Sequence, residues 1–520
     1  MTTTATFTSK IALIVALGGF LMGFDASVIS GVNKFVQIDF NLTDLQLGFS
    51  VSSLTIVAAL AMVFSGPLSD RYGRKLMLKY CAVVFAISAI GSSIATSFIP
   101  FLIFRMLGGI GVGASLILAP MYIAEIAPAE SRGRLVSFNQ LNIVVGITAA
   151  FFSNYYILSL GDSNSSWITS LGLSQYNWRW MLGVEALPAL VYFFGLSAVP
   201  RSPRWLMAQG RESEALKVLK RFSDEENAAE DLKTIKASLT AAQGKNQASY
   251  LEIFKPAMRT VLIIGIVVSV LQQITGINAV FFYAPMIFEQ SGIGTNASFI
   301  QAVLVGLTNV VFTVIAMALI DRIGRKPLLV AGVSGIVLFM GLLAYGFNEA
   351  SYTLQEEQLV LLSEDIRSQV APLIGQEYSG DVSYKEALKL TLGATKAKIH
   401  EGALIKAAIS MNSKLILIGI LGFVACFAVS LGPVMWVLFS ELFPLKVRGV
   451  AISFVGFINS GISALVQFIF PWELSTLGSA TTFLIYGVFA AIGLLLVLKF
   501  VPETKGRSLE ELEAKLVRSS

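Results

Sequence analysis

The stretch Leu271–Pro285, LQQITGINAVFFYAP, lies within an apolar run that begins near Val261 and is long enough to cross a bilayer. It places two adjacent carboxamides, Gln272 and Gln273, and a third at Asn278 inside that run, followed by three aromatic residues. Buried amides in hydrocarbon are costly unless they are hydrogen-bonded. The segment must therefore find polar partners, and we expect the rest of the chain to build a membrane pathway around it.

The three carboxamides cannot share one face of a straight helix. Successive residues turn by about 100° around an α-helix, so Gln272, Gln273 and Asn278 would point in three directions. Gly276 lies between them, and glycine tolerates the backbone angles of a helix break. A break there would let the amides converge on a neutral polyhydroxylated ligand, since amides both donate and accept hydrogen bonds. The alternative is that the amides only join transmembrane helices.

The composition is that of a membrane protein. Of the 520 residues, 55% are hydrophobic and 14% are charged, which excludes a soluble enzyme. Both cysteines lie inside apolar segments, so neither a disulfide framework nor a thiolate metal site is expected, and no cofactor is implied. A crossing needs about 20 mostly apolar residues. We expect twelve crossings, at 9–31, 46–68, 76–97, 99–122, 135–158, 178–199, 258–284, 297–319, 326–346, 413–438, 447–471 and 479–501.

The positions of lysine and arginine predict the orientation in the membrane. Basic residues cluster in the short loops after segments 2, 4, 8 and 10, whereas the alternate short loops hold very few. Because such loops stay on the cytoplasmic side, both termini are predicted to be cytoplasmic in a multi-pass protein of the cell inner (plasma) membrane. The net charge of +5 therefore reflects topology rather than nucleic-acid binding.

The sequence repeats internally. DRYGRK begins at Asp70 and DRIGRK at Asp321, and the two halves end alike, in VPRSPRW from Val199 and VPETKGR from Val501. Two six-helix halves related by a parallel repeat are a known transporter architecture. We therefore predict an all-α membrane protein with an N-terminal six-helix half at 1–199, a cytoplasmic helical linker at 200–257, a C-terminal six-helix half at 258–501 and a cytoplasmic tail at 502–520.

The spacing of the repeated motifs is longer in the second half, which places an insertion at 347–412 on the outer face. Within it, Leu354–Ile366 and Tyr384–Ile399 show the apolar spacing of helices. This predicts a surface-lying helical pair, with a soluble binding module as the alternative. In the linker, RESEALKVLKRF at 211–222 is the clearest helical run, and we interpret it as a solvated cap.

Three ionisable residues lie at membrane depth: Asp25, Arg105 and Glu185. Such residues are expensive and are candidates for function. Counted from the predicted segment ends, all three lie about 10 Å below the outer boundary, so they can meet. A nearby guanidinium favours the ionised form of a carboxyl group, whereas burial disfavours it. If the pairing of Asp25 with Arg105 differs between two conformations, the proton affinity of Asp25 differs between them as well. A static buried ion pair is the alternative. The only histidine, His400, falls in the insertion, which leaves a carboxylate, Asp25 first, as the proton carrier.

The repeated motifs bring a second set of charges to the cytoplasmic helix ends, where acids and arginines can pair across helices. Part of this pattern is ordinary positive-inside bias, but matched acids in both halves favour latches that close the cytoplasmic side in one state. The predicted gate consists of Asp70, Arg71, Arg74, Glu125, Arg132 and Arg204 in the first half and Asp321, Arg322, Arg325, Glu441 and Arg448 in the second.

Seven motifs in order resemble those of the sugar porter family of the major facilitator superfamily, with bacterial proton-coupled xylose and hexose symporters the most similar. They are GFLMGFDASVISG (19–31), SDRYGRK (69–75), PMYIAEIAPAESRGRLVSFNQ (120–140), LQQITGINAVFFYAP (271–285), IDRIGRK (320–326), GPVMWVLFSELFP (432–444) and PETKGRS (502–508). The resemblance implies the major facilitator fold and a transporter that imports a pentose or hexose with protons through alternating access. We expect it to function as a monomer, although the sequence leaves the oligomeric state open.

The resemblance also implies roles for individual residues. Asp25 would be the proton acceptor, Arg105 its switching partner and Glu185 an accessory acid. Trp436 would pack on the sugar ring, and Asn459 would line the site. The sugar would be hydrogen-bonded by Gln140, Gln272, Gln273, Asn278 and Asn309.

Three residues depart from the family pattern. Met22 stands where xylose-type symporters have an aromatic residue, and Ser460 stands where they have tryptophan, so the identity of the sugar is open. Arg201 replaces a glutamate in VPRSPRW, which removes an acid from one predicted latch.

Other classes of function remain as alternatives. A facilitator that ignores protons is one, although passive relatives carry asparagine where this chain has Asp25. A sugar sensor is another, but such sensors carry long cytoplasmic tails. A membrane enzyme is disfavoured because the sequence shows no nucleophile–base pair, metal-ligand cluster or phosphate-cradling loop.

Overall fold

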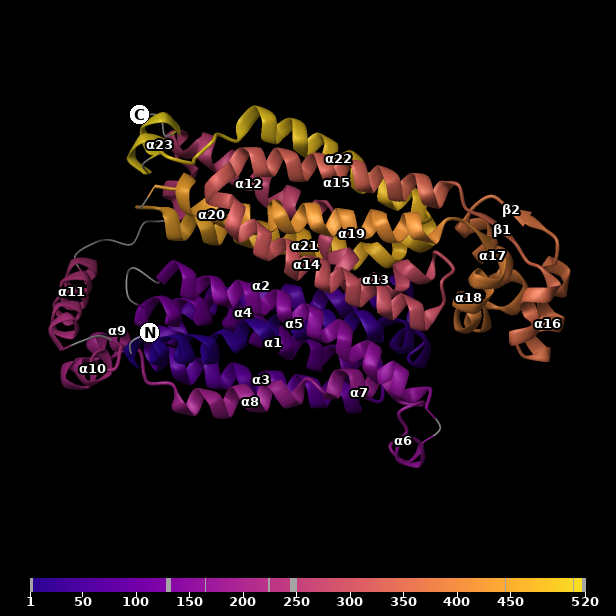
Figure 1. Cartoon of the computed structure of the whole chain (residues 1–520), viewed down its shortest axis with the longest axis horizontal. Helices are drawn as coiled ribbons and strands as arrows, with labels where there is room; N and C mark the ends of the chain where they lie inside the picture. The colour runs from indigo at the N-terminus through magenta and orange to yellow at the C-terminus, as the bar shows by residue number, and fades with distance from the viewer. Residues whose placement is uncertain are drawn as a thin grey trace. The chain divides into compact units, whose positions relative to one another are not determined.

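The computed structural model describes residues 3–127, 132–163, 165–222, 225–243, 250–444, 446–507 and 509–516. The first half of the sequence forms α1 (Thr3–Asp39), α2 (Asp44–Tyr72), α3 (Arg74–Ile94), α4 (Phe98–Ile126), α5 (Arg132–Gly161), α6 (Ser166–Ser170), α7 (Asn177–Gly183) and α8 (Ala186–Ala198) (Figure 1). The linker forms α9 (Pro203–Ala208), α10 (Glu212–Leu219) and α11 (Glu225–Gln243), followed by the 3₁₀ helices Tyr250–Phe254 and Pro256–Met258.

The second half begins with α12 (Arg259–Ile274), α13 (Ile277–Glu289), α14 (Thr295–Ile323) and α15 (Arg325–Asn348). After the insertion it continues with α19 (Ser413–Val429), α20 (Leu431–Leu442), α21 (Arg448–Thr476), α22 (Ser479–Phe500) and α23 (Leu509–Leu516). The described residues contain twelve spans that are long and apolar enough to cross a membrane, three of them built from consecutive helices. The expected twelve crossings are thereby confirmed.

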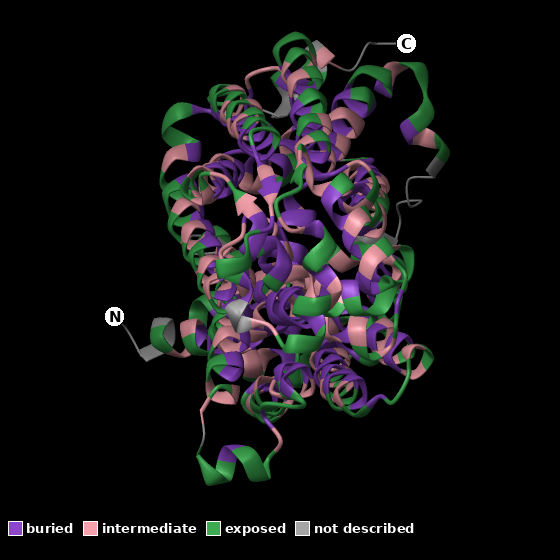
Figure 2. Ribbon diagram, turned by 90° about the vertical axis from the view of Figure 1, so that its right-hand side faces the viewer, coloured by how far each residue is buried: buried purple, intermediate pink, exposed green. Residues whose placement is uncertain are grey.

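The membrane helices carry apolar side chains on both their buried and their exposed sides. Exposed residues run along one side of many helices and buried residues along the other (Figure 2). On α2 the exposed side includes Leu60, Val63 and Phe64, which are 51%, 55% and 63% exposed. Side chains of this kind favour hydrocarbon over water. They are the surface that we expect to face lipid.

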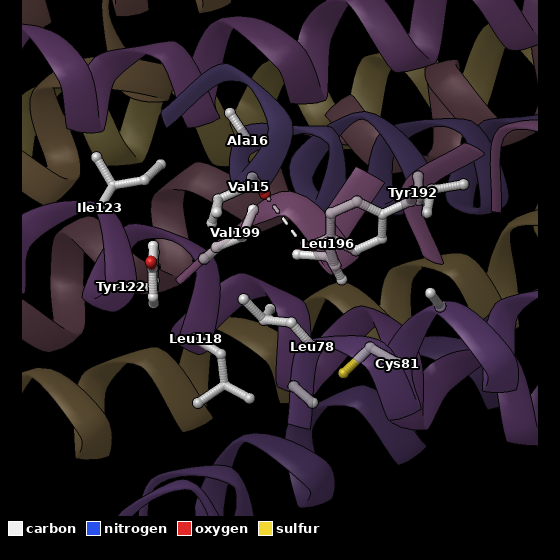
Figure 3. Close-up of a cluster of buried hydrophobic side chains, with 14 of the residues drawn as sticks. Val15, Ala16, Leu78, Cys81, Leu118, Tyr122, Ile123, Tyr192, Leu196 and Val199 are labelled. Atoms are coloured by element: carbon white, nitrogen blue, oxygen red, sulfur yellow. Dashed lines mark hydrogen bonds between the residues drawn. The ribbon is translucent and has the colours of Figure 1, made fainter. Parts of the chain in front are cut away.

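A buried apolar cluster holds the first-half helices together (Figure 3). Leu78 of α3, Leu118 of α4 and Leu196 of α8 are fully buried in it. The hydroxyl of Tyr192 donates to the backbone oxygen of Val15 at 3.3 Å, and that of Tyr122 donates to the oxygen of Pro200 at 2.8 Å. Each polar tip is therefore satisfied, as a water-free interior requires.

Contacts group the chain into two compact units that do not follow the order of the sequence. One unit comprises Met1–Ser27, Ser53–Ala150 and Arg179–Ser249, and the other Val28–Ser52, Phe151–Trp178 and Tyr250–Ser520. The second unit thus includes one end of α1 and the start of α2. There Asn33 donates to the backbone oxygen of Phe282 at 2.8 Å, and the Lys34 ammonium lies 2.9 Å from the carboxylate of Glu289.

The expected break in the amide-bearing segment lies at Gly276. Helix α12 ends at Ile274 and α13 begins at Ile277, and Gly276 between them has φ 85° and ψ 15°. This left-handed conformation suits glycine because it has no Cβ. A second irregularity follows at Tyr283, whose φ of −126° and ψ of 15° kink α13 before Pro285.

Replacing Gly276 by alanine is expected to destabilise the protein. The left-handed backbone costs an ordinary residue about 1–2 kcal/mol, and the added Cβ would lie 2.9 Å from the ring of Tyr486. We expect a lower midpoint of thermal unfolding in detergent. Gly461→Ala on α21 is the matched control, because a Cβ there meets no heavy atom within 4 Å. Equal midpoints for the two variants would contradict the strain at Gly276.

The insertion is a folded lobe beyond the ends of α15 and α19 (Figure 1). Its sheet has the order β2-β1-β3 and is antiparallel, with Tyr352 opposite Tyr378 and Ser351 opposite Ser410. Tyr352 stacks on Tyr384 at a ring distance of 5.3 Å within a buried apolar cluster. The elements are β1 (Ser351–Thr353), a 3₁₀ helix (Glu356–Leu361), α16 (Glu364–Val370), a 3₁₀ turn (Ala371–Leu373), β2 (Glu377–Tyr378), α17 (Asp381–Leu392), α18 (Ala394–Ala408) and β3 (Ile409–Ser410).

The helical pair predicted for the insertion is partly wrong. The second predicted run corresponds to α17 and the start of α18, but Leu354 of the first run forms a β-bridge with Ile374, and an α-helix begins only at Glu364. The strands have two or three residues each, too few for an alternating pattern to show. They form because distant residues pair, and periodicity does not report such pairing.

Candidate functional site

The amides of the opening stretch converge in one buried network. Asn278 donates to the side-chain oxygen of Gln273 at 2.8 Å, and Gln273 donates to that of Gln272 at 3.1 Å. Asn459 of α21 closes the network by donating to Gln272 at 2.7 Å and accepting from Gln273 at 3.1 Å. Gln272, Gln273 and Asn459 are buried, and Asn278 is half-buried. The break at Gly276 therefore brings together groups that a straight helix would separate.

The network extends along α21 through residues that sequence reasoning missed. Asn278 donates to the hydroxyl of Ser463 at 2.6 Å, and Gln467 donates to the same hydroxyl at 2.8 Å. The hydroxyl of Tyr283 then donates to the backbone oxygen of Gln467 at 2.9 Å. Asn459, Ser463 and Gln467 recur every four residues, so they line one face of α21. Polar residues at every fourth position of an otherwise apolar helix were the sequence signal that could have identified Ser463 and Gln467.

The other predicted sugar contacts lie outside this network. Asn309 of α14 is buried, but it joins none of these hydrogen bonds among the described residues. Trp436 of α20 is 42% exposed and meets Phe439 edge to face at 6.0 Å. Gln140 lies exposed on α5, in the other compact unit. Met22 is half-buried and packs against the apolar cluster of the first half.

The three charges predicted at one membrane depth lie together in the first unit. A guanidinium nitrogen of Arg105 lies 2.5 Å from one carboxylate oxygen of Asp25, and the guanidinium also donates to the backbone oxygen of Asp25 at 3.3 and 3.4 Å. Glu185 is 1% exposed and interacts electrostatically with both. Oδ2 of Asp25 and Oε1 of Glu185 have no hydrogen-bond partner among the described residues.

Gly108 of α4 leaves room for the carboxylate of Asp25. A Cβ on Gly108 would lie 2.6 Å from Oδ2 of Asp25 and 2.6 Å from the hydroxyl of Ser88. A side chain there would collide with the carboxylate or displace it. Sequence reasoning missed this residue, although it lies in the glycine-rich run that follows Arg105.

The repeated motifs form a matched pair of charge clusters, one in each half. In the first, Arg74 binds Asp70 at 2.7 Å and Glu125 at 3.1 Å. The hydroxyl of Ser202 donates to the second oxygen of Glu125 at 2.5 Å. The Asp70 side chain is 69% exposed, so its pair with Arg74 contributes little to stability.

The second cluster has the same arrangement. Arg325 binds Asp321 at 3.1 Å and Glu441 at 2.8 Å. The hydroxyl of Thr504 donates to the second oxygen of Glu441 at 2.6 Å. Each cluster ties together helix ends of its own half of the sequence.

The remaining predicted gate residues take no part in these carboxylate contacts within the described chain. Arg71 lies over the ring of Tyr72 at 5.3 Å, and Arg448 donates to the backbone oxygen of Phe443 at 3.0 Å. Arg204 and Arg322 are exposed. The side chain of Arg132 lies outside the described residues.

Comparison with known proteins identifies the family. The sequence model of the family described as "Sugar (and other) transporter" matches residues 11–360 and 392–516. The arabinose-proton symporter of Bacillus subtilis (strain 168) is 35% identical over 509 residues, which cover 98% of this chain and 94% of that protein. The D-xylose-proton symporter of Escherichia coli (strain K12) is 34% identical over 537 residues, covering 97% and 95%. The chain belongs to the sugar transporter family of the major facilitator superfamily.

Comparison with solved structures supports the same family. The inward-open structure of the xylose transporter XylE from E. coli is similar with a TM-score of 0.74 and 31% sequence identity. The match covers 97% of this chain and 99% of that one. The predicted all-α major facilitator fold with twelve membrane helices is confirmed. Residues 361–391, within the insertion, are not matched by the family model.

Proposed function

We propose that the protein is a secondary active transporter that imports a monosaccharide together with protons through alternating access. The observation that carries the proposal is the buried cluster of Asp25, Arg105 and Glu185. Names of relatives support it, since two of the most similar are an arabinose-proton and a D-xylose-proton symporter. We further propose that it acts as a monomer, with no cofactor, metal or nucleic-acid partner, and not as an enzyme.

The charge balance of the cluster explains how it would carry a proton. With both carboxylates ionised, Asp25, Glu185 and Arg105 sum to one negative charge, and a net charge buried away from water is costly. One proton makes the cluster neutral. The carboxylate oxygens without hydrogen-bond partners in the described structure, on Asp25 and Glu185, are where such a proton can bind.

The sugar would bind at the amide network of α12, α13 and α21. Amides offer both donors and acceptors to sugar hydroxyls, and Gln272, Gln273, Asn278 and Asn459 can exchange their mutual hydrogen bonds for bonds to a ligand. Trp436, Gln140 and Asn309 remain proposed contacts on the strength of the sequence resemblance alone.

Counterflow of radiolabelled sugars in proteoliposomes, with and without a pH gradient, tests the proposal. Counterflow together with accumulation driven by the gradient supports symport. Counterflow that ignores the gradient would identify a facilitator, and sugar binding without counterflow would identify a sensor. Pentoses and hexoses should both be tested, because they present the same kind of hydroxyl groups.

We also propose which parts of the chain lie on each side of the membrane. We place both termini and the linker at 200–257 on the cytoplasmic side of the plasma membrane, with the halves at 1–199 and 258–501 and the tail at 502–520. The insertion at 347–412 then lies outside. The basic residues at the repeated motifs support this orientation.

Breaking the ion pair between Lys34 and Glu289 is expected to favour opening at the outer ends of α1 and α13. The ammonium of Lys34 bonds to Glu289 at 2.9 Å and to the hydroxyl of Thr295 at 3.1 Å. The Glu289 side chain is 8% exposed, so solvent screens the pair weakly. Glu289→Gln should shift the opening equilibrium by about 1–2 kcal/mol, or roughly 5- to 30-fold.

Distances between spin labels at exposed Leu45 and Ile300 would report this opening. Asp365→Asn is the control, because it breaks an exposed ion pair with Lys396 inside the insertion. If Glu289→Gln leaves the distance distribution as in the control, the pair between Lys34 and Glu289 does not hold these ends together.

A further inference from the structure

Arg201 and Glu503 occupy equivalent positions in the internal repeat. Ser202 bonds to Glu125 in the first charge cluster, and Thr504 bonds to Glu441 in the second, through equivalent hydroxyl contacts of 2.5 and 2.6 Å. The residue before each hydroxyl is Arg201 in one half and Glu503 in the other. The two halves therefore carry opposite charges at equivalent places.

Glu503 occupies the N-terminus of α15. Its carboxylate accepts hydrogen bonds from the backbone N–H groups of Arg325 at 3.1 Å and Lys326 at 3.0 Å. Burial alone would raise the pKa of Glu503, but backbone N–H donors, including these two, outweigh it and lower the pKa below its ordinary value. The first N–H groups of a helix have no partner within the helix and favour an anion. In this half the chain supplies that anion itself.

At the equivalent helix end in the first half, no carboxylate of the described residues lines the cavity that opens there. Helix α3 begins at Arg74 after Gly73, whose φ of 91° resembles the 109° of Gly324 before α15, so the two helix ends have similar backbones. A cavity of about 210 Å³ opens at this end. An engineered protein cavity of about 150 Å³ binds benzene, so this volume is large enough for a phosphate group. The cavity is lined by Tyr72, Gly73, Arg74, Lys75, Leu76, Lys79, Arg201, Ser202 and Trp205.

The cations lining the cavity, apart from Arg74, have only neutral partners among the described residues. Lys75 and Lys79 donate to the backbone oxygen and hydroxyl of Ser197, at 3.1 and 3.0 Å. Arg201 lies over the ring of Trp205 at 5.7 Å. The lining residues that the structure describes include no aspartate or glutamate. Three positive charges thus gather where the other half of the molecule holds a carboxylate.

We propose that this cavity binds a phosphate-type oxyanion, which takes the place that Glu503 fills in the second half. Its oxygens would accept from the backbone N–H groups of Arg74 and Lys75, and Lys75, Lys79 and Arg201 would balance its charge. The anion is a free phosphate or phosphate ester, or the phosphate of a lipid headgroup. By joining Arg201 to the start of α3, it tethers the linker as Glu503 tethers the tail to α15. The proposal does not depend on which sugar is carried.

Binding of inorganic phosphate to the purified full-length protein in detergent tests the proposal. The unfolding temperature should rise with phosphate at constant ionic strength, because a ligand that binds only the folded state stabilises it. Arg201→Glu supplies an internal carboxylate. It should raise the unfolding temperature without phosphate and weaken phosphate binding by at least about tenfold.

Two further variants keep the test independent of any folding defect in Arg201→Glu. Lys79→Gln removes one lining charge and should also weaken phosphate binding, whereas Arg204→Gln, an exposed arginine outside the cavity lining, should not. If phosphate raises the unfolding temperature no more than chloride does, or raises it equally in all variants, the proposal is overturned.

The source of the anion is decided in nanodiscs. If nanodiscs of phosphatidylglycerol stabilise the unsubstituted protein more than Arg201→Glu, and abolish the effect of added phosphate, the occupant is a lipid headgroup. If phosphate acts equally in phosphatidylglycerol and phosphatidylcholine, the occupant is a soluble phosphate. If the unsubstituted protein and Arg201→Glu are stabilised equally in every nanodisc, neither a lipid headgroup nor a soluble phosphate occupies the cavity.

Discussion

Replacing Asp25 by asparagine is expected to abolish sugar accumulation driven by a pH gradient while leaving counterflow largely intact. Asparagine has nearly the shape of a protonated aspartic acid but cannot release a proton. The variant can therefore complete the sugar half of the cycle without coupling it to protons, because coupling requires both ligands to bias the same step. Uptake against a sugar gradient and counterflow, measured on one proteoliposome preparation, separate the two activities.

A static ion pair predicts a different outcome. Removing one partner of a buried pair commonly costs about 3–5 kcal/mol because a charge remains without compensation. In that case Asp25→Asn would lose stability and counterflow together. Arg105 would, however, keep its two hydrogen bonds to the backbone oxygen of residue 25, which does not depend on the side chain. We therefore expect a smaller loss of stability and a retained counterflow signal.

Glu473→Gln is the matched control for this experiment. Glu473 of α21 is also a buried carboxylate, 7% exposed, and it accepts a hydrogen bond from Tyr486 at 2.6 Å. It lies outside the cluster of Asp25, Arg105 and Glu185, so coupling should survive its loss. If Asp25→Asn still concentrates sugar against its gradient, Asp25 is not the coupling acid, and Glu185 becomes the next residue to replace.

The features that were predictable from sequence are those that depend on local pattern. Apolar length predicted the membrane helices, and polar residues beside Gly276 in an apolar run predicted both a break and the convergence of Gln272, Gln273 and Asn278. Counting residues from the segment ends placed Asp25 and Arg105 at one depth, because a helix rises by a fixed amount per residue. The observed contact of 2.5 Å agrees with that count.

The features that escaped prediction depend on which helices are neighbours. Ser463 and Gln467 join the amide network only because α21 packs beside α13, and Gly108 matters only because its missing Cβ leaves space for Asp25. The small sheet of the insertion forms between residues as far apart as Ser351 and Ser410. The replacement of an acid by Arg201 was visible in the sequence, but the cavity beside Arg201 was not.

Replacing Gln273 by alanine is expected to weaken sugar binding by about 5- to 150-fold, measured by calorimetry on purified protein. Gln273 donates to Gln272 and Asn459 and accepts from Asn278, so it bonds directly to all three of the other amides in the network. Truncating it would leave sugar hydroxyls unpaired in a buried site, at roughly 1–3 kcal/mol. The loss should appear in affinity more than in thermal stability, because Gln272 and Asn459 still bond to each other at 2.7 Å.

A purely structural role for the amides predicts the opposite pattern, and Asn154→Ala shows what that pattern looks like. Asn154 of α5 is 1% exposed and donates to the backbone oxygen of Val28 at 3.0 Å, so it joins two helices without belonging to the network. Its replacement should lower the unfolding temperature and leave sugar affinity unchanged. If Gln273→Ala behaves like Asn154→Ala, losing stability with unchanged affinity, the network holds helices together and the sugar binds elsewhere.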